Sequence, residues 1–244
     1  MVTKTWFAVL GLSFWLLAAC NLAAQSRTSQ PTIPSVPTKA SIPVLSTPTT
    51  PPVAVLTQYL ENPQIVEVDT FDDPSGWNPT NEISNGWLLL VGRGDNGWHG
   101  LSNKAIFQAG TGVVINFEFT PDEFFEMYFE QGAWATDFYK RFGVYVNEDY
   151  SNANLFMGRE RTDFHVLPGN LAFNKGTWYS LLMAVGEGGN FLALIWDPTD
   201  PQKNLQYRTV MENWRDIRWT FRIQLNTGAV LFDDFQEIQF DRIK

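Results

Sequence analysis

The chain has 244 residues, a net charge of −9 from 17 Lys and Arg against 26 Asp and Glu, 44% apolar residues and a single Cys. The acidic balance argues against a nucleic-acid-binding protein, which needs a basic face to neutralise phosphates. A single Cys excludes an internal disulfide.

The first 20 residues have the pattern of a secretory signal. Lys4 supplies one positive charge, and residues 6–18 form an apolar run that is shorter than the roughly 20 residues needed to span a bilayer. Residues 17–20 (LAAC) resemble the lipobox of bacterial lipoprotein signal peptides. The resemblance implies loss of residues 1–19, acylation of Cys20 with fatty acids such as palmitate, and a mature chain anchored by its lipid outside the cytoplasmic membrane. The alternative is an ordinary secretory signal whose cleavage site precedes a Cys by chance.

Residues 20–60 are predicted to form a disordered linker. Eight of the 14 prolines lie between Cys20 and Pro63, and 12 Ser or Thr residues are interleaved with them between residues 26 and 57. Such a segment lacks the apolar area that would offset its chain entropy, and its prolines favour extended conformations. We expect a spacer that holds the folded residues 61–244 away from the membrane.

The rest of the chain consists of short runs that alternate between apolar and polar residues. These runs are predicted strands, and they lie at residues 65–71, 113–119, 142–146, 178–185, 191–196, 219–225 and 230–240. Residues 186–190 (GEGGN) predict a hairpin turn. Residues 121–126 and 211–217 are the best helix candidates, each of a turn or two. About a dozen strands without covering helices predict an all-β, antiparallel two-sheet sandwich or barrel.

Three segments resemble bacterial domains of the concanavalin A-like jelly-roll group, which contains laminin G-like modules, legume lectins and laminarinase-type glucanases. Residues 69–77 (DTFDDPSGW) are similar to the opening motif of these domains, residues 175–179 (KGTWY) to a strand after a turn, and residues 226–235 (NTGAVLFDDF) to the closing strand. The resemblance implies two curved sheets packed face to face, with a concave face that commonly receives an extended glycan. Fold alone does not supply function.

Motifs for catalysis are weak in this sequence. Glucanases of this fold carry Glu-x-Asp-x-Glu on one strand, which places a nucleophile and a general acid about 5 to 5.5 Å apart. The chain has no such run, and its nearest acidic clusters are Asp122 and Glu123 with Glu126, and Glu118 with Glu130. We expect Glu118 to lie on the ordinary solvent face of a strand. Nucleophile-elbow and zinc-ligand spacings are also missing.

A structural calcium ion is the one cofactor that the resemblance suggests. Several families of this fold hold calcium between the first and last strands, with an Asp of the last strand as a ligand. The matching residues are Asp234 with Asp233 beside it, and Asp69 and Asp72 if the terminal strands pair. The alternative is that these Asp residues stabilise turns.

Glycan binding would need exposed aromatic rings with polar neighbours. Residues in polar or Gly-rich loops are the candidates, and the predicted ligand-binding set is Trp98, His99, Trp134, Tyr139, Tyr150 and Arg159. Trp214 is a further loop tryptophan, and each loop tryptophan can also simply plug one end of the core. Tryptophans at alternating strand positions (Trp178, Trp196 and Trp219) are predicted to lie in the core.

The sequence therefore predicts a membrane-anchored lipoprotein whose β-sandwich binds an extracellular carbohydrate or cell-envelope polymer. Two alternatives remain open. One is a sugar-acting hydrolase, which would need an acid or base in one concave pocket from the set His99, Glu118, Glu130, Asp137 and His165. The other is a non-catalytic protein-interaction module of the cell envelope.

Overall fold

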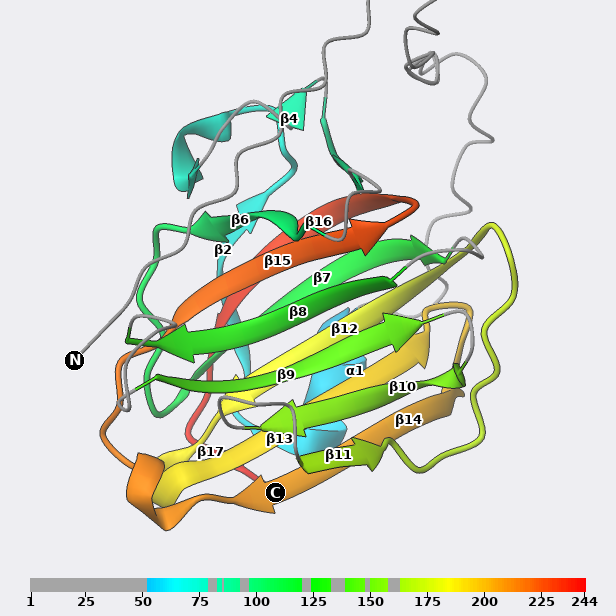
Figure 1. Cartoon of the computed structure of the whole chain (residues 1–244). Coiled ribbons are helices and arrows are strands. Elements are labelled where there is room, and N and C mark those ends of the chain that lie inside the picture. Colours follow the sequence, from blue (N-terminus) through cyan, green and yellow to red (C-terminus); the bar gives the residue numbers. More distant parts are fainter. Residues whose placement is uncertain are drawn as a thin grey trace, which may run out of the picture. The chain divides into compact units, whose positions relative to one another are not determined.

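Strands dominate the computed structural model, which describes residues 52–78, 83–84, 86–92, 97–119, 124–132, 139–147, 150–157 and 163–244 (Figure 1). These residues belong to one compact unit, Leu45–Lys244. The predicted signal, Cys20 and most of the predicted linker lie outside the described residues. Across the described part of the chain, no helix is both long and apolar enough to cross a membrane.

One sheet has seven antiparallel strands. In spatial order they are β11 (Asp163–Val166), β10 (Tyr150–Met157), β9 (Lys140–Asn147), β8 (Phe124–Gln131), β15 (Thr220–Thr227), β6 (His99–Asn103) and β3 (Trp77–Asn78). Neighbouring strands of this sheet come from distant parts of the sequence, as when β15 pairs with both β8 and β6.

The second sheet is also antiparallel. Its order is β14 (Asp200–Val210), β13 (Asn190–Asp197), β12 (Thr177–Val185), β7 (Thr111–Phe119), β16 (Ala229–Gln239), β5 (Trp87–Val91) and β4 (Ile83–Ser84), and β2 (Gln64–Asp69) pairs with the other half of β16. The pairing of β2 with β16 confirms that the first and last long strands meet. We call this the eight-stranded sheet.

Short elements complete the chain. Within the described residues they are α1 (Pro52–Tyr59), the pair β1 (Leu60–Glu61) with β17 (Arg242–Ile243), and the 3-10 turns η2 (Pro74–Gly76), η3 (Glu187–Gly189) and η4 (Glu212–Trp214). The predicted hairpin at residues 186–190 is confirmed, because β12 and β13 pair on either side of η3.

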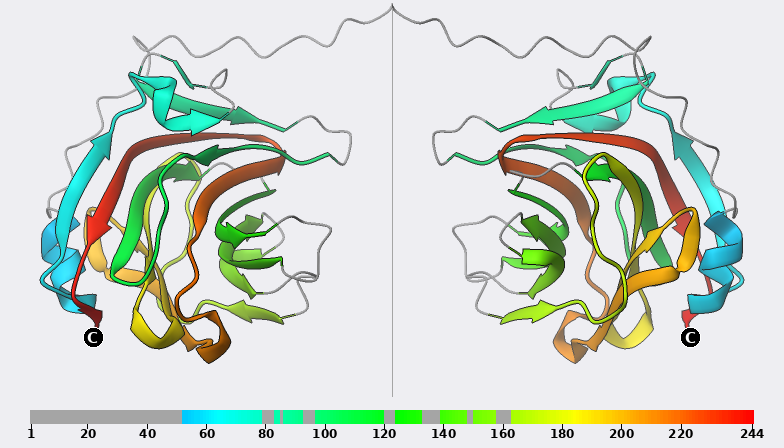
Figure 2. Two further views of the ribbon diagram at one scale, coloured as in Figure 1. Left: turned by 90° about the vertical axis from the view of Figure 1, so that its left-hand side faces the viewer. Right: turned by 90° about the vertical axis from the view of Figure 1, so that its right-hand side faces the viewer.

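The main core lies between the two sheets and consists of alternate residues from both. Phe117, Phe125 and Phe232 are fully buried there, and the ring centroid of Phe125 lies 5.4 Å from that of Phe117 and 5.7 Å from that of Phe232. A second apolar cluster covers the far side of the eight-stranded sheet, where α1 inserts Val55 and Leu56. Figure 2 shows α1 and the seven-stranded sheet on opposite sides of the eight-stranded sheet, and β16 bending around the seven-stranded sheet. The outward face of the seven-stranded sheet is therefore on the inside of the bend.

The opening motif at residues 69–77 has a structural role. The Asp69 carboxylate accepts hydrogen bonds from the Phe71 backbone N–H at 2.7 Å and from the Trp77 indole N–H at 2.8 Å. The Trp77 ring is fully buried and packs edge-on against Phe235 at 5.0 Å. Asp69 thus supplies the acceptor that a buried indole needs, which explains the Asp-to-Trp spacing of this motif.

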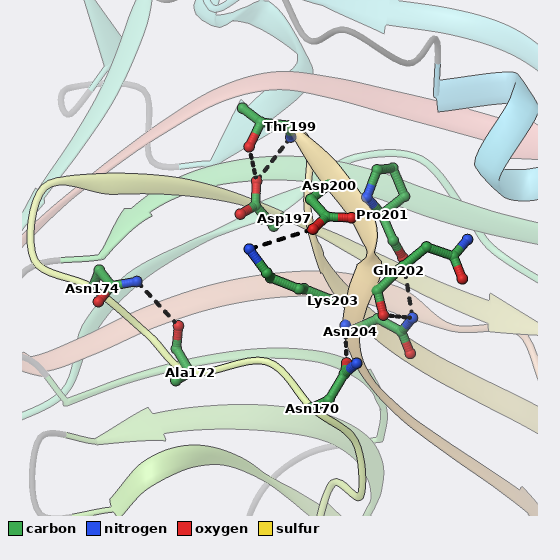
Figure 3. A network of polar contacts seen from close by, with 10 residues as sticks. All are labelled: Asn170, Ala172, Asn174, Asp197, Thr199, Asp200, Pro201, Gln202, Lys203 and Asn204. Carbon is green, nitrogen blue, oxygen red and sulfur yellow. Dashed lines mark hydrogen bonds and ion pairs between the residues drawn. The ribbon is translucent and has the colours of Figure 1, made fainter.

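A strap, residues 167–176, closes the edge of the sandwich beside β14. Figure 3 shows Asn170 facing Asn204, and each backbone N–H of this pair donates to an oxygen of the other residue at 3.0 Å. Gly169 forms a bridge with Leu205. The strap also buries Leu167 and Leu171 in the main core, so it covers an edge strand that would otherwise present unpaired backbone groups.

Two sequence predictions of local structure differ from the observed fold. The predicted linker ended at residue 60, but α1 already begins at Pro52, because Val55, Leu56 and Leu60 give this segment a buried apolar side. The predicted helical turn at residues 121–126 is wrong for residues 124–126, which begin β8.

Candidate functional site

Polar side chains gather on the outward face of β8 and its neighbours. Phe125, Met127 and Phe129 alternate into the main core, so the residues between them point outward. The outward set, which we call the β8 face, consists of Glu126, Tyr128 and Glu130 from β8, Arg141 and Tyr145 from β9, and Arg222 and Gln224 from β15. Carboxylates, guanidinium groups and phenols thus meet on three adjacent strands.

Glu126 lies at the centre of this face and has no exposed side-chain surface. Its Oε2 accepts a hydrogen bond from the Gln224 amide and lies 3.6 Å from the Arg141 guanidinium, which is 1% exposed. A charge this deeply buried persists only when it is paired and hydrogen-bonded. The contact therefore holds Glu126 as part of a buried ion pair.

Tyr128 packs between these charged groups. Its hydroxyl donates a hydrogen bond of 2.9 Å to the Gln224 side-chain oxygen, and the Arg141 guanidinium lies 5.8 Å from its ring centroid. Burial raises the pKa of the Tyr128 hydroxyl well above its usual range. Tyr128 therefore remains a neutral donor at physiological pH.

Glu130 is more accessible than Glu126, with 18% of its side chain exposed. One of its oxygens accepts a hydrogen bond of 3.0 Å from the Tyr139 hydroxyl, and the other lies 3.5 Å from the Arg222 guanidinium. Burial, followed by the negative charge of Glu130, raises the pKa of Tyr139 above its usual range. Glu130 and Arg222 thus form an ion pair that solvent can reach, whereas Tyr139, which was predicted as an exposed ligand-binding residue, is buried beside Glu130.

Aromatic rings border the opposite end of the β8 face. Trp98 contacts the ring of Phe124 at 4.9 Å, and Phe124 contacts Tyr145 at 5.7 Å, both edge-on. Tyr145 is the register partner of Glu126 on β9. Trp98 and Phe124 are partly exposed, so they provide an apolar border beside the charged groups.

The structure brings only some of the predicted site residues to this face. Trp98 and Tyr139 lie there. His99 does not, because its register partner Leu225 points into the core and its Nδ1 lies 3.2 Å from the Val91 carbonyl oxygen of the other sheet. Tyr150 and His165 lie in strands of the same sheet, and their side chains are outside the described part. Trp134, Asp137, Arg159 and Cys20 lie outside the described residues.

The suggested pairing of Glu118 with Glu130 is wrong. Glu118 belongs to β7, and its neighbours Phe117 and Phe119 are in the core, so it points out of the eight-stranded sheet. Glu130 points out of the other sheet, on the opposite side of the core. Burial raises the pKa of the Glu118 carboxyl, so Glu118 is not a freely solvated strand residue either.

The tryptophans differ in how deeply they are buried, and the local sequence around them does not predict this burial. Trp214 is a plug of the core, packed against Trp219 at 5.6 Å. Trp196 is buried in the second apolar cluster, which also contains Val55 and Leu56 of α1, and not in the main core. Trp178 was expected in the core, but it is partly exposed on the outward face of β12, because Tyr179 takes the inward position.

The predicted calcium ligands each have partners within the protein. Asp72 accepts a hydrogen bond from the Thr70 hydroxyl, Asp233 from the backbone N–H of Asp234, and Asp234 from the Asn116 amide at 3.3 Å. In the described segments, no group of three or more His, Cys, Asp or Glu residues is placed to hold a metal ion. A calcium site at Asp234 stays a prediction, which would have to draw on backbone carbonyl oxygens.

Most residues of the β8 face were not predicted from the sequence. The signal was present in residues 126–130 (EMYFE), where two Glu residues flank a Tyr at alternate positions. This is the spacing of the glucanase motif with Tyr128 in place of the central Asp. The partners Arg141, Arg222 and Gln224 become visible only with the strand register.

No protein-family model matches the sequence, and no curated protein matches it. Solved structures do share the fold. The endo-β-1,3-glucanase of Pyrococcus furiosus is similar with a TM-score of 0.55 and 9% identity, over 75% of this chain and 98% of that chain. An endo-acting O-glycanase of the human gut microbiota, from work on mucin breakdown, gives 0.52 and 12%, over 72% and 99%. Rv0315 of Mycobacterium tuberculosis, an immunostimulatory antigen and pseudo β-1,3-glucanase, gives 0.52 and 12%, over 73% and 99%. At these identities the likeness establishes only the fold, an antiparallel two-sheet jelly roll.

Proposed function

We propose that this protein recognises a carbohydrate chain on the β8 face. The observation that carries the proposal is the meeting, on the inside of the bend, of two carboxylates, two guanidinium groups and a border of partly exposed aromatic rings. Sugar sites combine aromatic surfaces with a few placed polar groups, and Glu130 and Arg222 offer both an acceptor and donors. The structural neighbours include glucanases and an O-glycanase, which supports this choice of ligand class.

Binding without cleavage fits the geometry best. A retaining glycosidase needs a carboxylate that can approach the anomeric carbon and a second one that donates a proton. Glu126 is fully buried and engaged by Arg141 and Gln224, so it cannot reach a sugar in this arrangement. Of the two β8 carboxylates that the structure describes, only Glu130 is accessible, and one carboxylate does not make the pair.

Hydrolysis is the second candidate, and one observation favours it. Glu126 and Glu130 are four residues apart on the same face of β8, which is the spacing of the glucanase motif. Movement of Arg141 away from Glu126 would be needed to free the first carboxylate.

The two functions separate in one experiment on the full chain. Native-gel retardation by laminarin, a β-1,3-glucan, and by mucin glycans reports binding, and release of reducing ends reports cleavage. We expect retardation without released ends, and we expect Arg222→Ala to weaken binding about tenfold because a hydrogen bond to a charged group contributes about 1.5 kcal/mol or more. Glu212→Gln, in the exposed turn η4 outside the β8 face, is the control and should bind as the native chain does.

Two results would overturn this proposal. Binding that Arg222→Ala leaves unchanged would place recognition elsewhere. Released reducing ends that Glu126→Gln abolishes would make the protein a hydrolase.

We also propose that Cys20 is acylated and anchors the domain outside the cytoplasmic membrane. The support is the lipobox at residues 17–20 together with the Pro-, Ser- and Thr-rich segment that follows. Bacteria fed a palmitate analogue should label the native protein, whereas Cys20→Ser should abolish labelling and release the chain from membranes. Labelling that survives Cys20→Ser would refute the anchor.

A further inference from the structure

Two tryptophans lie together on the side of the sandwich opposite the β8 face. Trp87 on β5 and Trp178 on β12 both point out of the eight-stranded sheet, because their neighbours Leu88 and Tyr179 are buried in the main core. Their ring centroids are 5.6 Å apart with an angle of 46° between the planes. Both side chains are partly exposed.

These indoles come from strands that are not neighbours. β7 and β16 lie between β12 and β5 in the sheet order, which separates their backbones by about 14 Å at the usual strand spacing. Both side chains must therefore lie along the sheet, over the two intervening strands, to reach each other. They form a shelf on the surface and not two isolated projections.

Polar groups adjoin this shelf. Asn116 on β7 accepts a hydrogen bond of 2.7 Å from the Ser180 hydroxyl and donates one of 3.3 Å to Asp234. Asp234 has a left-handed backbone at a β-bulge, which turns its side chain to the same face as Asn116. Glu118 is the register partner of Trp178 and shares its face.

One polar group of this shelf has no partner within the described part of the domain. The Trp87 indole N–H is buried and has no hydrogen-bond acceptor among the residues that the structure describes. An unpaired buried donor is costly, and here it belongs to a side chain whose ring is still partly exposed. A small rotation of this ring toward a ligand would give the N–H an oxygen acceptor.

We propose that Trp87, Trp178, Glu118 and Asn116 form a second carbohydrate-binding surface, separate from the β8 face. Indole faces stack on the C–H side of sugar rings, while a carboxylate and an amide hydrogen-bond hydroxyl groups. The ligand class rests on the proposed function, whereas the surface itself does not. Two sites on opposite sides of one domain would let the protein hold two chains of a polymer and gain avidity.

The test compares variants of the full chain in native gels that contain laminarin or mucin glycans. Trp178→Ala should weaken retardation about fivefold, the loss expected for one aromatic stacking contact. Glu118→Gln, which keeps the shape of the side chain, should weaken it less and carries the test should Trp178→Ala fail to fold. The control is Trp214→Phe, at a core plug away from this shelf, which should bind as the native chain does.

Each outcome decides between the two sites. Retardation that falls with both Trp178→Ala and Arg222→Ala supports both surfaces. Retardation that responds to Arg222→Ala but to neither Trp178→Ala nor Glu118→Gln overturns the second surface and leaves the β8 face standing. The reverse response overturns the β8 face alone, and a native chain that no polysaccharide retards overturns both.

Discussion

Replacing Arg141 by Met tests the buried ion pair that defines the β8 face. At the observed 3.6 Å between Arg141 and Glu126, the Coulomb attraction is about 4 to 5 kcal/mol at an effective dielectric constant of about 20. Removing one partner leaves the other charge buried and unpaired, and such changes destabilise proteins by about 3 to 5 kcal/mol. We expect a loss of this size for Arg141→Met. Adding Glu126→Gln should recover most of it, because no unpaired charge then remains.

Equilibrium urea unfolding of the full chain at pH 7, followed by tryptophan fluorescence, measures these free energies. Lys203→Met is the matched control, since its exposed pair with Asp200 should contribute less than about 1 kcal/mol. Two results would refute the reasoning. Arg141→Met could cost no more than Lys203→Met, or the double variant could cost as much as the two single changes added together.

Three further predictions concern the rest of the fold. Gly169→Ala should destabilise the domain by more than about 2 kcal/mol in urea unfolding, because an added Cβ would overlap the Asn204 carbonyl oxygen. Gly176→Ala has a positive φ, but its Cβ would make only ordinary van der Waals contact with the Glu118 carboxylate, so it should cost only about 1 to 2 kcal/mol. Equal costs for the two variants would contradict the strap contact. Burial and two neighbouring carboxylates on β2 raise the pKa of the Glu237 carboxyl. The folded state therefore binds the carboxyl proton of Glu237 more tightly than the unfolded state does, and the protein loses stability as pH rises from the ordinary pKa of 4.5 through the raised value. Glu237→Gln should therefore be more stable than the native chain at pH 7 and lose this advantage near pH 4, and an advantage that does not depend on pH would exclude the titration. If calcium binds at Asp234, a chelator should lower the native melting temperature and leave that of Asp234→Ala unchanged; identical melting of the native chain with and without the chelator would remove calcium from the account.

Alternation of apolar residues was enough to predict an antiparallel sandwich or barrel, and the resemblance at residues 69–77, 175–179 and 226–235 narrowed this to a jelly roll. The run at residues 113–119 has Phe117 and Phe119 at alternate positions, and both face the core as a half-buried strand requires. Alternation divides a strand into two faces but does not show which face points into the core. Trp178 was therefore predicted to lie in the core, whereas its neighbour Tyr179 points inward. α1 was missed because it directly follows the Pro-, Ser- and Thr-rich run and begins with Pro52 itself, so it was included in the linker, although Val55 and Leu56 pack it against the sheet.

The β8 face could not be assembled from the sequence in the same way. Glu126 and Gln224 are 98 residues apart along the chain, and only the pairing of β8 with β15 brings them together. No local pattern encodes this register. Glu130 was recognised as a candidate acid but was matched with Glu118, since the sequence does not say that β7 and β8 belong to different sheets.

Recognition without cleavage on the β8 face is tested most directly by hydrogen–deuterium exchange of the full chain, with and without a laminarin-derived oligosaccharide. The mass of the oligosaccharide is measured by mass spectrometry in the same samples. The account predicts slower exchange in β8, β9 and β15 around Glu130 and Arg222, with the oligosaccharide mass unchanged after incubation. Shortened oligosaccharide would contradict binding without cleavage, and unchanged exchange in these three strands at saturating sugar would contradict recognition on the β8 face.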